Sequence, residues 1–154
     1  MGTKLATLLT GICVNKKYFP SGLEEELERY SQDPMIRVVM LPKDTNALGF
    51  IFGGVILSQL DLAASEEAIA RAGRRVVTKV IREVDFVAPV KVGDWVSFYT
   101  RIKDTERTSV TVEVLVVAHR GPRRDRLHKV THAEAVFVAV DEDGHSAPLL
   151  PLDD

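Results

Sequence analysis

The chain has 154 residues, of which 45% are hydrophobic, 27% charged and 6% aromatic, and its formal net charge is −2. This is the composition of an ordinary globular protein, and it excludes a disordered chain. The length predicts one domain with a core of its own. A charge this close to neutral gives no indication of nucleic-acid binding. No apolar run reaches the ~18 residues that a membrane-spanning helix needs.

The N-terminal stretch gives little indication of export. Residues 5–14 are only weakly apolar, and threonines and a glycine interrupt them, unlike the continuous apolar run of a signal peptide. The single cysteine, Cys13, cannot form an internal disulfide. A reducing compartment, the cytoplasm, is therefore the simplest expectation.

A short amphipathic helix is predicted next. Ser21 and Glu24 have the spacing of a capping box, in which the serine is the N-cap residue. The apolar stripe that follows consists of Leu23, Leu27 and Tyr30. Pro34 is expected to end the helix. We therefore divide the chain into an N-terminal extension, residues 1–34, and a domain, residues 35–154.

The domain begins with a short strand, predicted at residues 35–41, and continues with a long helix, predicted at residues 55–72. The first half of this helix has almost no polar face, and a helix that is apolar nearly all round is a buried one. Gly73 is expected to end the helix. One curved sheet gives such a helix too little cover, so either a sheet wrapped round it or a partner subunit is expected.

Four strand-like segments follow the long helix, at residues 76–87, 95–103, 108–118 and 130–140. β-Branched residues alternate with other residues along them, which is a strong strand pattern. In the first segment Val80, Val84 and Phe86 are predicted to share one face. Short links between consecutive strands favour an antiparallel meander. The element order predicts an α+β fold.

The residues best suited to catalysis lie just before the long helix. Asp44 and Asn46 precede the pair Gly53 and Gly54 at the mouth of that helix. A helix N-terminus offers unpaired N–H donors, and glycines let a substrate oxygen approach them, so backbone alone could form an oxyanion hole. Asp44 could be a general base or a nucleophile, and Asn46 could orient water or a carbonyl group. The alternative is that both side chains only form Asx turns.

Histidine and metal chemistry have less support in the sequence. The histidines His119, His128, His132 and His145 are scattered, and a structural or solvated role is expected for each. No pair of Cys or His residues has the spacing of metal ligands, and no nucleotide-binding motif is present. We therefore expect neither a metal nor a cofactor.

The catalytic segment resembles a known family. The order Asp44-Thr45-Asn46, Gly49, Phe52-Gly53-Gly54, Leu60-Asp61 is similar to that of the hotdog-fold acyl-CoA thioesterases of the bacterial acyl-CoA hydrolase type, and of the cytosolic long-chain acyl-CoA hydrolases of animals. Weaker matches continue along the strands, at Val77-Thr78, Phe86, Pro89-Val90, Gly93-Asp94, Thr108-Ser109 and Ala133-Glu134-Ala135. The resemblance covers roughly residues 35–151. It implies a hotdog fold, in which a five-stranded antiparallel sheet wraps round the central helix.

The resemblance also implies a reaction, the hydrolysis of acyl-CoA to fatty acid and coenzyme A by a homodimer or a trimer of dimers. The family's catalytic carboxylate matches Asp44, and the asparagine that acts with it across the dimer interface matches Asn46. The glycines that match Gly53 and Gly54 open the helix whose amides polarise the thioester carbonyl. Phe50 stands where many bacterial members are polar, which leaves the chain-length preference open. A non-catalytic acyl-CoA-binding or regulatory module is the alternative.

Further candidates complete the predicted site. Asp61 is the secondary candidate for the catalytic carboxylate, because other hotdog thioesterases carry the base on the helix, although a supporting role is favoured. A hotdog dehydratase would need a histidine beside Asp44, and none falls there. A basic turn before the last strand is either a solvated turn or a site for the phosphates of coenzyme A. The candidate CoA-binding residues are Thr108, Ser109, Arg123, Arg124, Arg126 and Lys129. Few aromatic residues lie among them, which disfavours nucleic acid as a partner.

Overall fold

The computed structural model describes residues 5–7, 13–15, 20–31 and 33–152. Two short strands near the N-terminus, β1 (Leu5–Thr7) and β2 (Cys13–Asn15), pair antiparallel. The rest of the stretch considered above as a signal peptide, and the side chain of Cys13, lie outside the described residues. Within the described ranges no helix is both long enough and apolar enough to cross a membrane.

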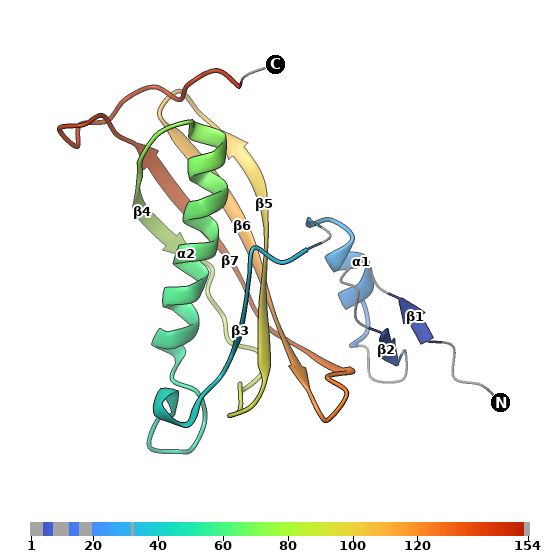
Figure 1. Cartoon of the computed structure of the whole chain (residues 1–154). Helices are drawn as coiled ribbons and strands as arrows, with labels where there is room; N and C mark the ends of the chain where they lie inside the picture. Colours follow the sequence, from blue (N-terminus) through green and yellow to red (C-terminus); the bar gives the residue numbers. More distant parts are fainter. Residues whose placement is uncertain (1–4, 8–12, 16–19, 32, 153–154) are drawn as a thin grey trace.

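A five-stranded antiparallel sheet curves along the long helix α2 (Gly53–Ala72), and the helix lies across one face of the sheet (Figure 1). The strands are β3 (Ile36–Val39), β4 (Val76–Arg82), β5 (Trp95–Thr105), β6 (Ser109–Arg120) and β7 (Arg126–Ala139). They lie in the order β3-β5-β6-β7-β4. This confirms the predicted α+β architecture of one sheet wrapped round one long helix.

Small side chains let α2 lie close to the sheet. Its buried residues are Ile56, Leu60, Ala63, Ala64, Ala68 and Ala72. The helix ends where predicted, at Gly73, whose φ of 66° is unfavourable for residues that carry a Cβ. A Cβ built on Gly73 would lie 3.0 Å from Leu150 Cβ, so this glycine also lets the C-terminal segment pack on the end of α2.

The described residues do not cover the other side of α2. Leu62 is 53% exposed and Ile69 is 39% exposed, although both belong to the apolar surface from which a fully buried helix was predicted. Only the side that faces the sheet is buried, so one sheet does not cover this helix.

Three predictions about β4 were wrong: where the strand ends, which strand it pairs with and which faces its residues occupy. The strand ends at Arg82 instead of residue 87, and it pairs with β7 on the far side of the sheet, so only β5, β6 and β7 form a meander. A register shift between Thr78 and Val80 turns the strand over. As a result Ile81 packs against the core and Val80 is exposed, the reverse of the predicted faces.

A short helix, α1 (Leu23–Leu27), packs on the face of the sheet opposite α2. Its predicted apolar stripe is buried there against Tyr99, Leu115, Val117 and Leu127. The predicted capping box does not form: Gly22, with φ of 82°, is the N-cap residue, and no side chain caps the helix. An ion pair of 2.7 Å between Glu26 and Lys129 also joins α1 to β7.

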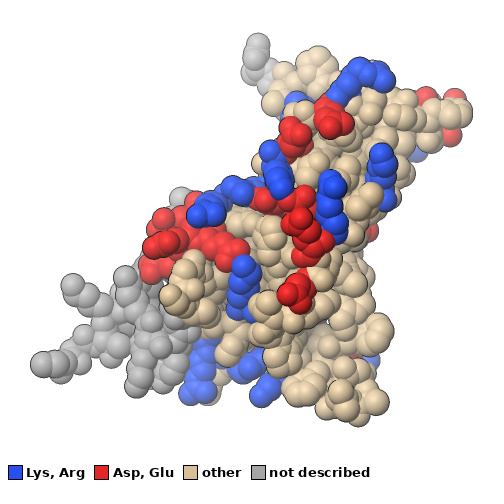
Figure 2. All heavy atoms as spheres, turned by 180° about the vertical axis from the view of Figure 1, so that it is seen from behind, with Lys and Arg blue, Asp and Glu red and all other residues tan. Residues whose placement is uncertain are grey.

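Charged side chains of both signs alternate along the face opposite α2, as Figure 2 shows from behind. Arg101 pairs with Glu113, and Lys103 pairs with Glu134. Arg82 lies 3.4 Å from the same Glu134. Because each of these basic groups has an acidic partner, this part of the sheet presents no unbalanced basic surface.

Candidate active site

Asp44 lies in a single 3-10 turn, η2 (Pro42–Asp44), just before α2. Its carboxylate Oδ2 accepts a hydrogen bond of 3.1 Å from the backbone N–H of Leu41, so the side chain caps its own turn. The structure gives no hydrogen bond to Asp44 Oδ1 from the described part of the chain. One carboxylate oxygen thus holds the turn and the other remains available to a ligand.

Asn46 forms an Asx turn, the alternative considered for it above. Its side-chain Oδ1 accepts hydrogen bonds from the backbone N–H groups of Leu48, at 2.9 Å, and of Phe50, at 3.2 Å. Gly49, with φ of 81°, makes this tight reversal possible. The amide Nδ2 of Asn46 has no hydrogen bond within the described ranges, and this donor is therefore available to another molecule.

Two backbone donors at the mouth of α2 have no partner in the part of the chain that the structure describes. Phe52, the N-cap residue, has no side chain that can accept a hydrogen bond, and its own N–H donates to the carbonyl oxygen of Asp44 at 2.8 Å. Among the described residues no acceptor faces the N–H groups of Gly53 and Gly54. These donors carry the positive end of the helix dipole, so they can stabilise an oxyanion.

Two aromatic rings lie against these glycines. A Cβ built on Gly54 would lie 2.5 Å from Phe52 Cε1, and one built on Gly53 would lie 3.5 Å from Phe86 Cζ. Any side chain at Gly54 would therefore displace the Phe52 ring. The backbone N–H of Ile51 donates to the carbonyl oxygen of Val90 at 2.9 Å, which ties the segment after β4 to the helix mouth. Reasoning from the sequence did not place the rings of Phe52 and Phe86 against these two glycines.

Asp61 lies away from the helix mouth. It is eight residues beyond Gly53, or about 12 Å along a helix. It is half-buried, and its Oδ1 accepts a hydrogen bond of 2.8 Å from Thr78 Oγ1 of β4. Ser58 and Ser65, on the same face, bond instead to carbonyl oxygens of their own helix. The bond from Thr78 to Asp61 links β4 to α2.

The predicted CoA-binding residues do not come together within one chain. Thr108 and Ser109 lie at the start of β6. Arg123 and Arg124 lie in the turn beyond its other end, and Arg126 is the first residue of β7. Eleven residues of extended strand separate the two groups, which is about 37 Å. One CoA molecule bound to a single chain could use only one of the two groups.

Several of the basic residues already have partners. The guanidinium of Arg124 lies 3.8 Å from the centre of the Trp95 ring, and Lys129 binds Glu26. Arg120, in the same basic run, donates to the buried carboxylate of Asp94 at 2.7 and 2.9 Å and to the carbonyl oxygen of Pro89 at 3.1 Å. The structure records no such partner for Arg123 within the described ranges. The hairpin lies at the same end of the sheet as the helix mouth (Figure 1).

His119 is fully buried on the sheet face opposite α2. Its Nε2 lies 3.0 Å from Ser97 Oγ, which in turn accepts a hydrogen bond of 2.9 Å from Arg37 Nε. Burial and the nearby charges of Arg37 and Arg124 lower the pKa of His119 to about 4. The imidazole is therefore neutral at pH 7, in agreement with the structural role expected for it. The pairing of His119 with Ser97 could not be read from the sequence, because it depends on strand register.

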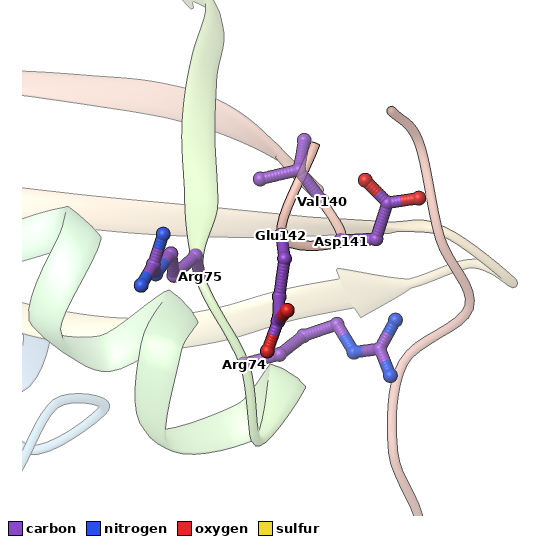
Figure 3. A pocket seen from close by; sticks show the side chains of 5 residues that line it. All are labelled: Arg74, Arg75, Val140, Asp141 and Glu142. Atoms are coloured by element: carbon purple, nitrogen blue, oxygen red, sulfur yellow. The ribbon is translucent and has the colours of Figure 1, made fainter. Parts of the chain in front are cut away.

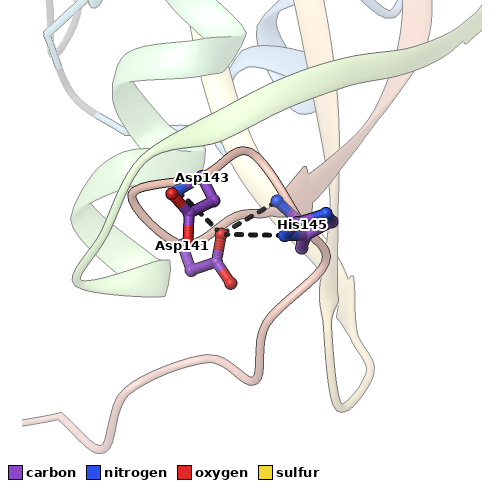
Figure 4. Close-up of side chains that lie close together, drawn as sticks. All are labelled: Asp141, Asp143 and His145. Carbon is purple, nitrogen blue, oxygen red and sulfur yellow. Dashed lines mark hydrogen bonds and ion pairs between the residues drawn. The ribbon is translucent and has the colours of Figure 1, made fainter.

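Two polar features lie at the other end of α2. A pocket of about 320 Å³ is lined by Arg74, Arg75, Val140, Asp141 and Glu142 (Figure 3). Nearby, ligand atoms of Asp141, Asp143 and His145 lie within 4.8 Å of one another, and all three residues are exposed (Figure 4). The Oδ1 of Asp141 accepts hydrogen bonds from the backbone N–H groups of Asp143 and His145, so this cluster is a capped turn.

Comparison with known proteins agrees with this architecture. A family model described as the thioesterase superfamily matches residues 48–123. An uncharacterized acyl-CoA thioester hydrolase of Zymomonas mobilis is 39% identical over 127 residues, which are 79% of this chain and 81% of the relative. Acyl-CoA thioester hydrolase YciA of Escherichia coli is 39% identical over 114 residues, which are 73% of this chain and 86% of YciA.

Solved structures give the same result. Cj0915, a hexameric hotdog fold thioesterase of Campylobacter jejuni, superimposes with a TM-score of 0.72 at 39% identity, over 76% of this chain and 90% of that one. An acyl-CoA hydrolase from Staphylococcus aureus, solved with butyryl coenzyme A, has a TM-score of 0.68 at 27% identity, over 77% and 74% of the two chains. The chain therefore belongs to the hotdog-fold acyl-CoA thioester hydrolases.

Proposed function

We propose that this chain is an acyl-CoA thioesterase that hydrolyses acyl-CoA to a free fatty acid and coenzyme A. One observation carries the proposal: the N–H groups of Gly53 and Gly54, which have no acceptor among the described residues, directly follow Phe52, whose N–H is bonded to the carbonyl oxygen of Asp44. The cytoplasm is the expected compartment, because the single cysteine offers no internal disulfide.

In the proposed reaction the thioester carbonyl oxygen accepts hydrogen bonds from the N–H groups of Gly53 and Gly54. As a general base, Asp44 removes a proton from a water molecule while the water oxygen adds to the carbonyl carbon. The C–S bond then breaks, the proton passes to the departing sulfur, and the acid and coenzyme A leave. As a nucleophile, Asp44 would instead displace the thiol, form an acyl anhydride and be regenerated by water.

A single turnover in ¹⁸O-labelled water identifies a nucleophilic Asp44 when water attacks the aspartyl carbon of the anhydride. A general base delivers labelled water oxygen to the fatty acid in the first turnover. With a nucleophile, water that attacks the aspartyl carbon of the anhydride leaves the label on Asp44, and the first acid released carries an unlabelled oxygen from the enzyme.

We propose that the active unit is a homodimer, assembled into a trimer of dimers, in which Asn46 of one subunit acts with Asp44 of the other. Supporting this, Leu62 on α2 and Val77 on the edge strand β4 are both more than half exposed. The outer edge of β4 has no pairing strand in the described sheet. Burying these apolar side chains would stabilise a pair of subunits. Cj0915 is described as hexameric.

For coenzyme A, we propose that the phosphates bind at the hairpin of Arg123, Arg124 and Arg126, because this hairpin lies at the same end of the sheet as the helix mouth. Lys129, already paired with Glu26, would have to exchange its partner in order to contribute. Thr108 and Ser109 would contact the same CoA molecule only from another subunit.

A module that binds acyl-CoA without hydrolysing it is the second candidate. The observation in its favour is that Asp44 and Asn46 each use one side-chain oxygen to hold a local turn. Thiol release, measured with acyl-CoA esters of several chain lengths, decides between the two. An enzyme releases coenzyme A with repeated turnover, whereas a binding module forms a complex and releases no thiol.

A further inference from the structure

We propose that Phe52 and Phe86 form the wall that binds the first carbons of the acyl chain, and so favour longer apolar acyl groups over acetyl. This inference rests on the proposed function, because it takes the position of the thioester carbonyl from it. Neither phenylalanine takes part in the bond-making steps. The inference gives them a role in the choice of substrate.

The first support is the position of the two rings. Phe52 Cε1 would lie 2.5 Å from a Cβ on Gly54, and Phe86 Cζ would lie 3.5 Å from a Cβ on Gly53. Successive residues of a helix point about 100° apart, so rings that lie against consecutive glycines flank the helix mouth on two sides. A carbonyl oxygen that reaches the N–H groups of Gly53 and Gly54 therefore brings its acyl carbons alongside aromatic surface.

The second support is the exposure of the rings. Phe52 is 59% exposed and Phe86 is 43% exposed, whereas Phe98 and Phe137 of the core are at most 1% exposed. The two rings thus add little to the core of this chain. Apolar surface of this size beside unpaired polar donors is the composition of a ligand site, in which apolar walls surround a few directed hydrogen bonds.

The third support is that the backbone carrying the two rings is held in place. Phe52 precedes α2 directly, and its backbone is fixed at both ends: its N–H donates to Asp44 and its carbonyl oxygen accepts from Val55. Phe86 is followed by Val87, whose N–H donates to the carbonyl oxygen of Val130. A wall fixed by the backbone can bind an acyl chain without first becoming ordered.

The expected effect increases with chain length. Each methylene group that is fully buried against such a wall improves binding about fourfold. Acetyl carries a single carbon beyond the carbonyl and gains least. Hexanoyl carries five carbons and gains most. The measurable quantity is therefore the ratio of kcat/KM for hexanoyl-CoA to that for acetyl-CoA.

The test compares the full-length wild-type chain with Phe86→Ala and Phe86→Leu, using thiol release from acetyl-, butyryl- and hexanoyl-CoA. Phe86→Ala should lower kcat/KM for hexanoyl-CoA about tenfold or more, and that for acetyl-CoA by less than about threefold. Phe86→Leu keeps apolar surface and should retain most of the wild-type ratio. Phe52→Ala, which removes the other apolar side chain, should lower the ratio in the same direction as Phe86→Ala.

A matched control is Ile102→Ala, since Ile102 is 37% exposed on β5 and lies away from the helix mouth. It should leave the hexanoyl-to-acetyl ratio unchanged. If Phe86→Ala does not fold, Phe86→Gln replaces it, because glutamine keeps much of the volume and removes the apolar surface. The same loss of ratio is then expected.

The inference is overturned if Phe86→Ala, or Phe86→Gln in its place, lowers kcat/KM equally for acetyl and hexanoyl, or lowers neither. An equal loss would mean that the ring only supports the fold of the mouth. These results are separate from a failure of the proposed function, which would appear as no thiol release by the wild-type chain from any of the three esters.

Discussion

The backbone N–H of Phe52 donates a hydrogen bond of 2.8 Å to the carbonyl oxygen of Asp44. This bond joins the turn that carries the carboxylate to the residue that opens α2. The turn that carries the carboxylate and the N–H groups of Gly53 and Gly54 are therefore linked through backbone, and the bond from Leu41 to Asp44 Oδ2 orients the carboxylate within the turn. Since the bond uses no side-chain atom of Asp44, substitutions at this position can change the carboxylate without disconnecting the turn from the helix.

The first prediction concerns Asp44→Asn. The amide oxygen of asparagine can still accept the hydrogen bond from Leu41 N–H, so the turn should keep its stability, but the side chain can no longer act as base or nucleophile. We expect turnover to fall by about 10²–10⁴-fold. Thiol release from butyryl-CoA measures this. Asp44→Ala, which also loses the turn bond, should be equally inactive and about 0.5–1.5 kcal/mol less stable in urea unfolding.

The matched control is Asp61→Asn, which can keep the hydrogen bond from Thr78 and should retain turnover close to wild type. An active Asp44→Asn variant together with an inactive Asp61→Asn variant would transfer the catalytic role to the helix carboxylate.

The second prediction concerns Arg123, the hairpin arginine for which the described ranges give no partner. Arg123→Ala should raise KM for acyl-CoA about three- to tenfold and leave kcat nearly unchanged, because phosphate binding is the same in the ground and transition states. The effect should shrink as salt is added. Arg29→Ala, at an exposed arginine following α1, is the control. An unchanged KM at low ionic strength would mean that the hairpin is only a solvated turn.

The main elements of the fold could be predicted from local pattern, whereas pairing and register could not. Apolar periodicity and Gly73 located α2 correctly, because both act within the helix itself. The inverted faces of β4 depend on a bulge beside Lys79 that no residue type signals. Ser21 has the chemistry of a cap, yet Gly22 takes that position because its φ of 82° is open to glycine.

The candidate site shows the same difference between what a local motif predicts and what depends on the folded sheet. Asp44, Gly53 and Gly54 lie close together in the sequence, so a motif was enough to bring them together. Phe86 comes from beyond β4, and its contact with Gly53 depends on how the sheet closes over the helix. The separation of Thr108 from Arg123 follows from the length of β6, which places the two at opposite ends.

The third prediction concerns pH and His119. The pKa of this imidazole is lowered to about 4, while an unfolded histidine titrates near 6.5. Between these values the unfolded chain binds a proton that the folded chain does not, so the free energy of unfolding should decrease as pH falls through this range. The contribution of His119 to the free energy of unfolding is fully present above pH 6.5. Up to about 3 kcal/mol of that free energy is lost by pH 4.

Urea unfolding of the wild type and of His119→Gln, at several pH values from 7 to 4, measures this contribution. Glutamine does not titrate and can still accept a hydrogen bond from Ser97, so the variant should lose less stability than the wild type on acidification. Parallel pH profiles for the two proteins would show that His119 is not the group responsible.

The fourth prediction concerns the shared site. Asp44 bonds to Leu41 and Asn46 bonds to Leu48, and among the described residues no hydrogen bond joins the two side chains. If the site combines Asp44 of one subunit with Asn46 of its partner, two inactive variants should complement each other. In a mixed dimer of Asp44→Ala and Asn46→Ala subunits, one site carries both changes and the other carries neither.

Random exchange makes half of the dimers mixed, and half of the sites in those dimers are intact. Thiol release after co-refolding should therefore recover to about a quarter of the wild-type value, by this two-fold counting. Each variant refolded alone is the control, and native mass spectrometry shows whether mixed dimers have formed. Mixed dimers without recovered activity would mean that each site is built within one chain. An Asn46→Ala variant that is fully active alone would remove Asn46 from the mechanism.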